Sequence, residues 1–482
     1  MTERAARGLT GLSTKLFYGS GSIAFGVKDN GFSTLLLLFY NQVVGLPSGL
    51  VGAAIMIALV VDAFLDPIVG QISDNLRSRW GRRHPFMYAS ALPVALSYLL
   101  LWSPPHWGQG ALFIYLVVVA IVVRTFITFY EIPSSALVAE LSDDYDQRTV
   151  FFAYRFFFGW FGGLAMSVLA FRVLLMPDAA HPVGQLNPAG YVSYGTIAAI
   201  VMFAAILISA AGTHRLIPQF HVPPPRRMSV GQMMGEMFAT LGNRSFLWLT
   251  VSGVFFSMAT GLVFALNVYF QTYLWQLSAV QISYFTLMAF VSAGLAFVFA
   301  LPLSRRYGKK SSAIVLFVAG LGIAAVPLAL RLANTFPLNG DPVLVPILLV
   351  FATFSLALMI ASSILMASML TDVVEENAIS TGRRSEGLFF AANSFMQKTT
   401  SAAGVFLSGL LLALVRFPAH AQPGHIDMEI VRHLALVYLP ALILLYGVAM
   451  VFLGFYRITR ESHEENLKRL AGEMAKAQPM VD

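Results

Sequence analysis

The sequence predicts an all-α membrane protein whose twelve transmembrane helices form two six-helix bundles. Apolar residues make up 57% of the 482 residues and charged residues only 11%, whereas charged residues reach about 25% in an ordinary soluble domain. Apolar stretches of the about 20 residues that cross a bilayer recur twelve times along the chain. Glycine and proline lie within these runs, as is typical of helices that pack closely in lipid.

The predicted spans cover residues 16–46, 49–73, 85–104, 111–140, 149–176, 190–213, 246–275, 281–303, 311–332, 344–371, 385–415 and 431–456. The longest polar interval lies between the sixth and the seventh span and contains Pro223-Pro-Pro. The chain is therefore predicted to divide into an N-terminal bundle (1–213), a cytoplasmic middle loop (214–245), a C-terminal bundle (246–456) and a cytoplasmic tail (457–482).

The two halves repeat a loop motif and a helix exit at matching places. Arg77-Ser-Arg-Trp-Gly-Arg-Arg83 follows the second span, and Arg305-Arg-Tyr-Gly-Lys-Lys310 follows the eighth. The fourth span ends in Leu137-Val-Ala-Glu-Leu-Ser-Asp-Asp144, and the tenth ends in Leu370-Thr-Asp-Val-Val-Glu-Glu376. A parallel repeat of this kind is typical of membrane proteins whose halves rock around a central site.

The basic residues of the loops gather on one side of the predicted helices. The positive-inside rule assigns that side to the cytoplasm, so we expect both termini to be cytoplasmic. The formal charge of +7 then reflects membrane orientation and does not indicate binding to nucleic acid. The residues concerned are Arg77, Arg79, Arg82, Arg83, Arg148, Arg226, Arg227, Arg305, Arg306, Lys309, Lys310, Arg383, Arg384 and the basic residues of both tails.

Several kinds of chemistry are excluded by what the sequence lacks. The chain has no cysteine, which excludes disulfides, thiolate metal sites and a cysteine nucleophile. Walker-type Gly-Lys-Ser/Thr, His-Glu-x-x-His and Gly-x-Ser-x-Gly motifs are absent. The first span has no cleavage site after a short apolar core, so we interpret it as a retained helix and not as a signal peptide. We expect no enzymatic activity and no bound cofactor.

Eight ionisable residues fall well inside predicted spans. Each costs roughly 2.5–3.5 kcal/mol at the centre of a membrane helix, so together they are expected to line a shared polar interior. Their formal charges sum to zero. The eight residues are Lys28, Asp29, Asp62, Asp66, Arg124, Glu131, Arg155 and Lys398.

Asp62 and Asp66 are four residues apart, which places both carboxylates on one face of a helix, about 6 Å apart at Cβ. Their mutual repulsion is relieved by a bound cation or a shared proton, and carboxylate oxygens suit a hard ion such as Na⁺. These two residues are therefore the candidate metal ligands. The alternative is that the pair only neutralises neighbouring Arg or Lys side chains.

A second polar face lies on the fourth span, where Arg124, Thr128 and Glu131 follow at i, i+4 and i+7. Thr128 is expected either to add an oxygen to the cation site or to bond back to its own helix. Glu131 offers two acceptors for the hydroxyls of a solute. Lys398 either neutralises an aspartate or forms a gating or binding ion pair.

The zero charge sum leads to a further hypothesis about Arg124. A balanced cavity has less need of an added cation, so the Arg124 guanidinium is a candidate to reach the Asp62/Asp66 pair and stand in for a metal. That arrangement would leave proton coupling or uniport.

These residues resemble the glycoside–pentoside–hexuronide:cation symporters, a family of the major facilitator superfamily. The resemblance covers most of the chain and rests on Tyr18-Gly-Ser-Gly with Lys28-Asp29, Asp62-Ala-Phe-Leu-Asp-Pro-Ile-Val-Gly70 with Asp74, Trp80-Gly-Arg-Arg-His-Pro85, Glu131-Ile-Pro-Ser-Ser-Ala-Leu137, Tyr154-Arg155-Phe156, Asp372-Val-Val, Gly382-Arg-Arg-Ser-Glu-Gly387 and Lys398. Three positions depart from the family pattern: Leu65 replaces an amide ligand, Ser135 a sugar-stacking Trp, and Arg124 a small residue.

The resemblance implies a role for each group of residues. Asp62, Asp66 and Thr128 would bind the coupling cation, Na⁺ or H⁺. Asp29, Glu131 and Arg155 would bind the solute, with Lys398 near both sites and Arg124 beside them. Asp74, Arg82 and Arg83 resemble the superfamily's cytoplasmic gating motif, in which loop charges latch helix ends between the halves.

We therefore expect cation-coupled symport of a sugar or glycoside by alternating access, by a monomer in a bacterial inner membrane whose partners are the solute and the lipid bilayer. One alternative is a carrier of a lysophospholipid-like amphiphile or an organic anion near Arg124 and Arg155, proton-coupled or a uniporter. A more distant alternative is a membrane receptor or enzyme.

Overall fold

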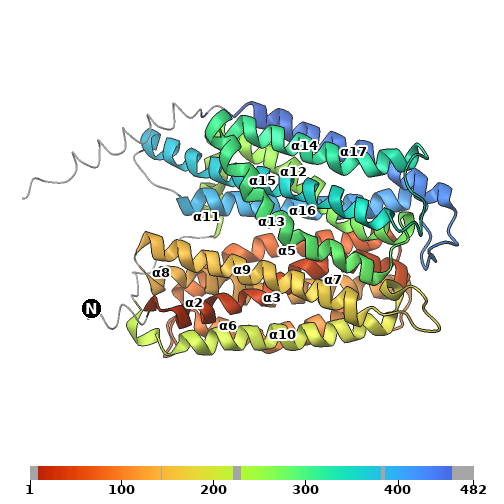
Figure 1. Ribbon diagram of the computed structural model, residues 1–482. Helices are drawn as coiled ribbons and strands as arrows, with labels where there is room; N and C mark the ends of the chain where they lie inside the picture. The colour runs from red at the N-terminus through yellow and green to blue at the C-terminus, as the bar shows by residue number, and fades with distance from the viewer. Residues whose placement is uncertain (1–8, 143, 221–229, 382–385, 457, 459–482) are drawn as a thin grey trace, which may run out of the picture. The chain divides into compact units, whose positions relative to one another are not determined.

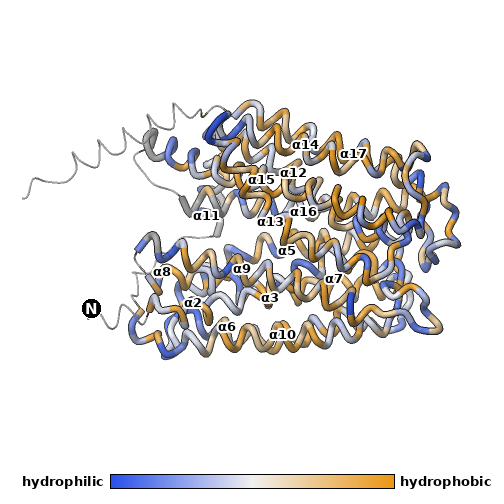
Figure 2. Tube along the Cα trace, viewed as in Figure 1, coloured by the Kyte–Doolittle hydropathy of each residue, from blue (hydrophilic) through white to orange (hydrophobic). Residues whose placement is uncertain are grey.

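The computed structural model describes residues 9–142, 144–220, 230–381, 386–456 and 458. Its regular elements in these ranges are helices, with no strand, which confirms the all-α prediction (Figure 1). Hydrophobic residues run along the helices and hydrophilic residues gather in the loops at their ends (Figure 2). Arg226, Arg227, Arg383, Arg384 and all of the tail except Ile458 lie outside the described residues.

The N-terminal half begins with a span that is divided into short pieces. These are α2 (Leu12–Ser20), α3 (Ser22–Asn30), the π-helical turn η1 (Gly31–Leu35), α4 (Leu36–Leu38) and a second π-helical turn, η2 (Phe39–Val43). The elements that follow are α5 (Ser48–Asn75), α6 (His84–Leu101), α7 (Gln109–Ala136), α8 (Val138–Leu141), α9 (Tyr145–Leu169), η3 (Ala170–Leu174), η4 (Gly184–Leu186) and α10 (Pro188–His214).

The predicted middle loop contains η5 (Ile217–Gln219), the short helix α11 (Val230–Ala239) and η6 (Thr240–Gly242). The second half consists of α12 (Arg244–Tyr269), η7 (Phe270–Leu274), α13 (Ala279–Tyr307), α14 (Lys309–Leu332), α15 (Leu344–Thr381), α16 (Glu386–Leu414) and α17 (Met428–Gly454). Each predicted span thus coincides with helical structure whose ends differ from the prediction by a few residues or, at the end of α15, by about three turns.

Ten helices among the described residues are long and apolar enough to cross a membrane. They match ten of the twelve predicted spans. The first span is helical but divided, and α16 carries a polar stretch that includes Asn393, Gln397 and Lys398. For these two spans, the membrane crossing stays a prediction.

The internal repeat extends to the backbone. At the end of the first span, Val44 N–H bonds to Phe39 O and Leu46 N–H to Tyr40 O, around Gly45 at φ +90°. At the end of the seventh span, Trp275 N–H bonds to Phe270 O and Leu277 N–H to Gln271 O, around Gln276 at φ +49°. The same turn therefore ends corresponding spans of both halves.

The basic loops also share a glycine with a positive φ. Gly81 and Gly308 stand before the last two basic residues of their motifs and have φ values of +73° and +78°. A side chain is strained in this left-handed conformation, whereas glycine adopts it freely. The loop glycine of each half thus allows the backbone to reverse between two consecutive spans.

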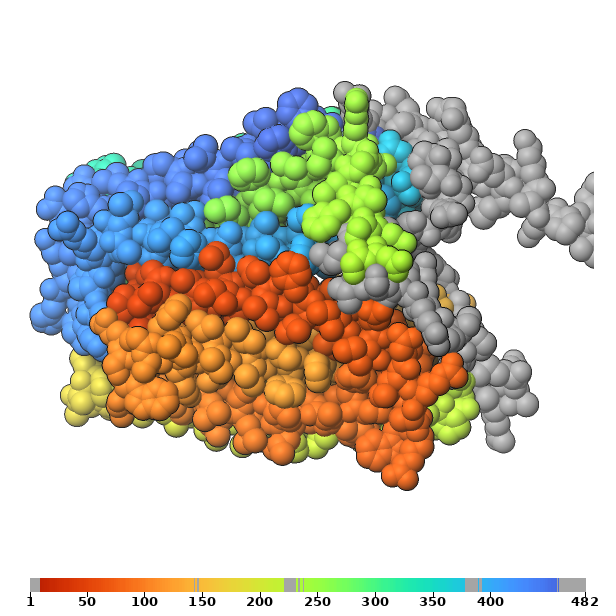
Figure 3. Space-filling model, turned by 180° about the vertical axis from the view of Figure 1, so that it is seen from behind, coloured from red at the N-terminus to blue at the C-terminus, as the bar shows by residue number. Residues whose placement is uncertain are grey.

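Two compact units share the chain. The first comprises residues 1–230, 261–286 and 402–431, and the second comprises residues 231–260, 287–401 and 432–482. This division crosses the predicted boundary between the halves, because short pieces of the C-terminal half belong to the first unit. One of them, residues 402–431, lies against the first spans, as the blue and orange-red atoms of Figure 3 show.

Neutral hydrogen bonds hold these pieces within the first unit. Ser48 Oγ donates to Gly409 O at 3.1 Å, and Tyr269 Oη donates to Asn41 Oδ1 at 2.9 Å. Gln42 Oε1 accepts from Tyr273 Oη at 3.0 Å and from the backbone of Ala421 at 2.9 Å. Most of the side chains in this seam are buried.

Glycines allow α3 and α9 to pack backbone to backbone. A Cβ added to Gly26 would lie 1.9 Å from Gly159 O, and one added to Gly163 would lie 2.7 Å from Gly26 O. No side chain fits there unless the helices separate. Close approach of small residues is the usual basis of helix association in membranes.

We predict that Gly26→Val lowers the free energy of unfolding by about 1–3 kcal/mol, because overpacking separates the two helices. Tryptophan fluorescence during heating in detergent would report this as a lower melting temperature. Gly110→Val is the matched control, since nothing lies within 4 Å of an added Cβ there. Equal melting temperatures for the two variants would contradict the packing argument.

The orientation of the protein in the membrane can be tested with single introduced cysteines, because the sequence contains no cysteine of its own. Arg77 and Ala179 are exposed in loops at opposite ends of the N-terminal spans. In intact spheroplasts, a membrane-impermeant maleimide should label the Ala179→Cys variant and should label Arg77→Cys only after the membrane is permeabilised. The reverse pattern would show that the basic loops are external.

Candidate functional site

The two predicted metal ligands lie halfway along α5. Asp62 is fourteen residues from the start of this helix, or about 21 Å at 1.5 Å per residue. Its side chain is 2% exposed, while Asp66, one turn further, is partly exposed. A carboxylate at this depth requires partners inside the protein.

α7 supplies partners for both acids. Arg124 Nη2 donates to Asp62 Oδ2 at 2.6 Å, and Thr128 Oγ1 donates to Asp62 Oδ1 at 2.8 Å. Thr128 Oγ1 also lies 3.1 Å from Asp66 Oδ1. The Thr128 hydroxyl therefore faces the acids, whereas that of Thr125, three residues earlier on the same helix, bonds back to Ile121 O at 2.8 Å.

Arg124 is enclosed on its other sides. The residue is 3% exposed, and its guanidinium carbon lies 5.4 Å from the centre of the Phe32 ring. The guanidinium also interacts electrostatically with Asp29 and Asp66. The Nε of Arg124 is buried and has no hydrogen-bond acceptor. The guanidinium therefore keeps one unsatisfied donor in this position.

α3 contributes the ion pair of Lys28 and Asp29. Lys28 Nζ lies 2.6 Å from Asp29 Oδ1; the lysine side chain is 2% exposed and that of the aspartate 60% exposed. Lys28 is thus buried, whereas the Asp29 carboxylate with which it pairs is exposed. Of the predicted solute-binding acids, Asp29 is the one best placed to meet a solute.

α9 brings Arg155 to the end of the polar face of α7. Its guanidinium donates to Ser134 Oγ at 2.9 Å and to the backbone oxygen of Glu131 at 3.1 Å, and its carbon lies 4.7 Å from the Phe25 ring centre. The Glu131 side chain is partly exposed. The structure therefore brings Asp29, Asp62, Asp66, Arg124, Thr128, Glu131 and Arg155 together within the first unit.

Lys398 is placed separately. It lies half-buried on α16, in the second compact unit. Its predicted proximity to the acids of the first unit stays a prediction.

Residues that sequence reasoning did not select also belong to the site. Phe25, Phe32 and Ser134 contact its arginines. Of these, Ser134 carried a usable signal, because it lies three residues after Glu131 on the same helix. The two phenylalanines resembled ordinary packing residues.

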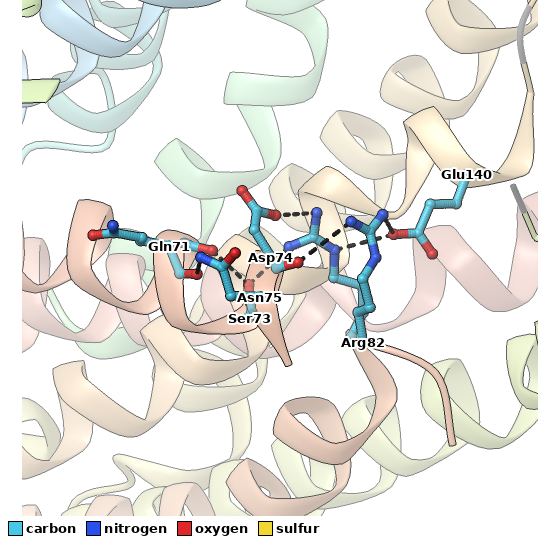
Figure 4. A network of polar contacts seen from close by, with 8 residues as sticks. Gln71, Ser73, Asp74, Asn75, Arg82 and Glu140 are labelled. Atoms are coloured by element: carbon cyan, nitrogen blue, oxygen red, sulfur yellow. Dashed lines mark hydrogen bonds and ion pairs between the residues drawn. The ribbon is translucent and has the colours of Figure 1, made fainter. Parts of the chain in front are cut away.

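The predicted gating residues form a network at the loop end of the N-terminal half (Figure 4). Glu140 Oε1 accepts from Arg82 Nη2 at 2.6 Å and from Arg83 Nε at 3.3 Å. Arg83 also pairs with Asp74 and donates to Ser73 Oγ at 2.8 Å. Glu140 was not predicted as a site residue, although it binds both arginines.

The second half repeats the central contact of this network. Lys309, which corresponds to Arg82, lies 2.6 Å from Asp372, an acid in the exit of the tenth span as Glu140 is in that of the fourth. Lys310 donates to the backbone oxygen of Tyr456 at 2.9 Å, after the end of α17. These ion pairs join elements inside one half each, so a latch between the halves stays a prediction.

Among the described residues, no group of three or more His, Cys, Asp or Glu side chains is arranged to hold a metal ion. The Thr128 hydroxyl lies within hydrogen-bond distance of both Asp62 and Asp66. Donors from α7 contact both oxygens of Asp62. This arrangement fits a carboxylate that is already neutralised better than it fits an open metal site.

We predict that Glu140→Gln lowers the free energy of unfolding by roughly 3 kcal/mol, because breaking a buried pair leaves the nearly buried Arg82 without its acid and Arg83 with the exposed Asp74 alone. Thermal melting in detergent would measure the loss. Glu236→Gln, at an exposed position of α11, serves as the control and should melt like the unaltered chain. A Glu140 variant as stable as this control would show that the network contributes little.

Comparison with known proteins agrees with this architecture. The chain is 26% identical to the uncharacterized symporter sll1374 of Synechocystis (95% of this chain, 96% of the relative). It is 23% identical to the isoprimeverose transporter of Lactiplantibacillus pentosus (93% and 89%) and 25% identical to the putative 2,3-dihydroxypropane-1-sulfonate exporter of Escherichia coli (90% and 91%).

A solved structure and a protein family also match this chain. The inward-open xylose transporter XylE of E. coli superposes with a TM-score of 0.57 over 95% of this chain and 98% of that one, at 15% identity. The family described as MFS/sugar transport protein matches residues 17–460. The chain is thus a multi-pass membrane transporter and not an enzyme, and it belongs to the MFS/sugar transport protein family.

Proposed function

We propose that this transporter is a secondary active symporter that moves a sugar or glycoside by alternating access, coupled to a cation, Na⁺ or H⁺. The observation that carries the proposal is the polar cluster at mid-depth of the first unit, where Asp29 and Glu131 are accessible beside Arg155. Charges at this depth are expensive and mark solute or ion pathways.

The chemistry of the accessible groups supports a polyhydroxylated solute. Carboxylate oxygens of Asp29 and Glu131 accept hydrogen bonds from hydroxyl groups. Phe25, which is partly exposed, provides an apolar ring surface beside Arg155. The similarity to an isoprimeverose transporter points in the same direction. Ser135 supplies no stacking surface, so we assign that role to the Phe25 ring.

An organic anion is the second candidate, and Arg155 favours it. The hydrogen bonds of its guanidinium go to a hydroxyl and a backbone oxygen, which leave its positive charge in place. A sulfonate or carboxylate would gain charge-assisted bonds from such a group. The sulfonate exporter among the relatives supports this reading, and a lysophospholipid-like amphiphile belongs to the same alternative.

The setting of this activity is also part of the proposal. We place the protein as a monomer in a bacterial inner membrane with both termini in the cytoplasm. The bacterial inner-membrane location is supported by a similar inner membrane symporter of E. coli. Binding of the cation would reduce repulsion between Asp62 and Asp66, and closure of the halves would follow the preference of the loaded site for the closed state.

The test is thermal stabilisation of the purified protein by a panel of glycosides, sugar sulfonates and lysophospholipids. A glycoside should stabilise the protein, and Asp29→Asn should weaken its binding at least about tenfold, since a hydrogen bond to a charged acceptor contributes about 1.5–3 kcal/mol. Asp341→Asn, in an exposed loop, should bind normally. Stabilisation only by sulfonates or lysophospholipids would replace the glycoside proposal with the anion alternative.

A further inference from the structure

The coupling site of the first unit already contains a cation that belongs to the chain. The Arg124 guanidinium lies 2.6 Å from Asp62 Oδ2, and the Thr128 hydroxyl lies 2.8 Å from Asp62 Oδ1. Each oxygen of this carboxylate therefore has a donor. A metal ion bound to Asp62 would have to displace one of these donors or bind an oxygen that already accepts a hydrogen bond, on a carboxylate already paired with a guanidinium.

Displacement of Arg124 is unfavourable for reasons visible in its surroundings. The side chain is 4% exposed, and the Phe32 ring lies 5.4 Å from its guanidinium carbon. Its Nε is buried without an acceptor, so Asp62 accepts the 2.6 Å hydrogen bond that holds the group. Moving it away from Asp62 would leave a buried charge unpaired, which is strongly destabilising.

Sharing the site is also unfavourable. Na⁺ is stabilised by several oxygen ligands whose negative charge it can offset. Here the guanidinium has already neutralised Asp62, and it also interacts electrostatically with Asp66. The Arg124 guanidinium would repel a second positive charge near the same two acids. In a site without Arg124, the two acids would attract that charge.

We infer that Arg124 permanently occupies the metal position of the coupling site, so that solute binding by this transporter does not depend on Na⁺ or Li⁺. This inference rests on the proposed function and excludes Na⁺ as the coupling cation. Arg124 is in this sense a specificity-determining residue. Its removal should uncover two carboxylates and a hydroxyl, Asp62, Asp66 and Thr128, which together can bind Na⁺.

The first experiment needs no solute. The melting temperature of the unaltered protein should be the same in NaCl, LiCl and choline chloride at equal ionic strength. Arg124→Gly should melt at a higher temperature in NaCl than in choline chloride. The Arg124→Gly/Asp62→Asn double variant, which lacks the acid as well, should lose that response, and the Arg172→Ala control should never show it.

The second experiment adds a glycoside that the unaltered protein binds. Its affinity should be unaffected by Na⁺ in the unaltered protein and should increase about tenfold with Na⁺ in Arg124→Gly, a size typical of coupling between two sites. Failure to find any glycoside would count against the proposed function only, because the metal experiment stands without it.

Two results would overturn the inference. One is stabilisation of the unaltered protein by Na⁺ over choline, which would show that the metal binds despite Arg124. The other is a folded Arg124→Gly variant that is indifferent to Na⁺, which would show that Arg124 does not fill a metal position. If that variant does not fold, Arg124→Gln replaces it, since the amide fills part of the space without the charge.

Discussion

The buried ion pair between Asp62 and Arg124 is the interaction on which the rest of the polar site depends. Neither charge is tolerable alone at mid-membrane depth, and their pairing across α5 and α7 makes both affordable. It also sets the register of the two helices, because Thr128 then meets both aspartates. Arg155, arriving from α9, continues the same polar face beyond Glu131.

The two ends of the N-terminal half are held by different chemistry. At the basic loop, ion pairs join Asp74, Arg82, Arg83 and Glu140 within that half. At the opposite end, neutral hydrogen bonds join Gln42 and its neighbours to pieces of the C-terminal half inside the first unit. A neutral hydrogen bond contributes only about 0.5–1.5 kcal/mol net, because water replaces it readily. Charged contacts thus reinforce a half, and weaker contacts join segments of both halves.

The two halves share their architecture but not the polar residues of the site. Arg82 with Glu140 and Lys309 with Asp372 both form a 2.6 Å contact, and the loop glycine of each half has a positive φ. In contrast, seven of the eight ionisable residues within the spans lie in the first half, and only Lys398 lies in the second. Turn geometry and ion pairs of the loops serve folding in both halves, whereas solute chemistry is needed once.

The sequence by itself determined the fold class, the position of the spans and the repeat, because hydropathy and turn-forming glycines act over short distances along the chain. It also indicated that Arg124, Thr128 and Glu131 share a helix face, since that follows from helical periodicity. Only the tertiary structure decided which acid Arg124 binds, because the answer depends on how α5 packs against α7.

The same reason explains what the sequence did not reveal. Glu140 resembled an ordinary acid at a helix end, and its role follows from arginines 57 and 58 residues away. The boundary of the compact units differed from the boundary of the halves because Tyr269 and Tyr273 bond to residues more than 200 positions earlier. Periodicity determines which side chains share a face, whereas the partner of each face is selected by packing between helices that are distant in the sequence.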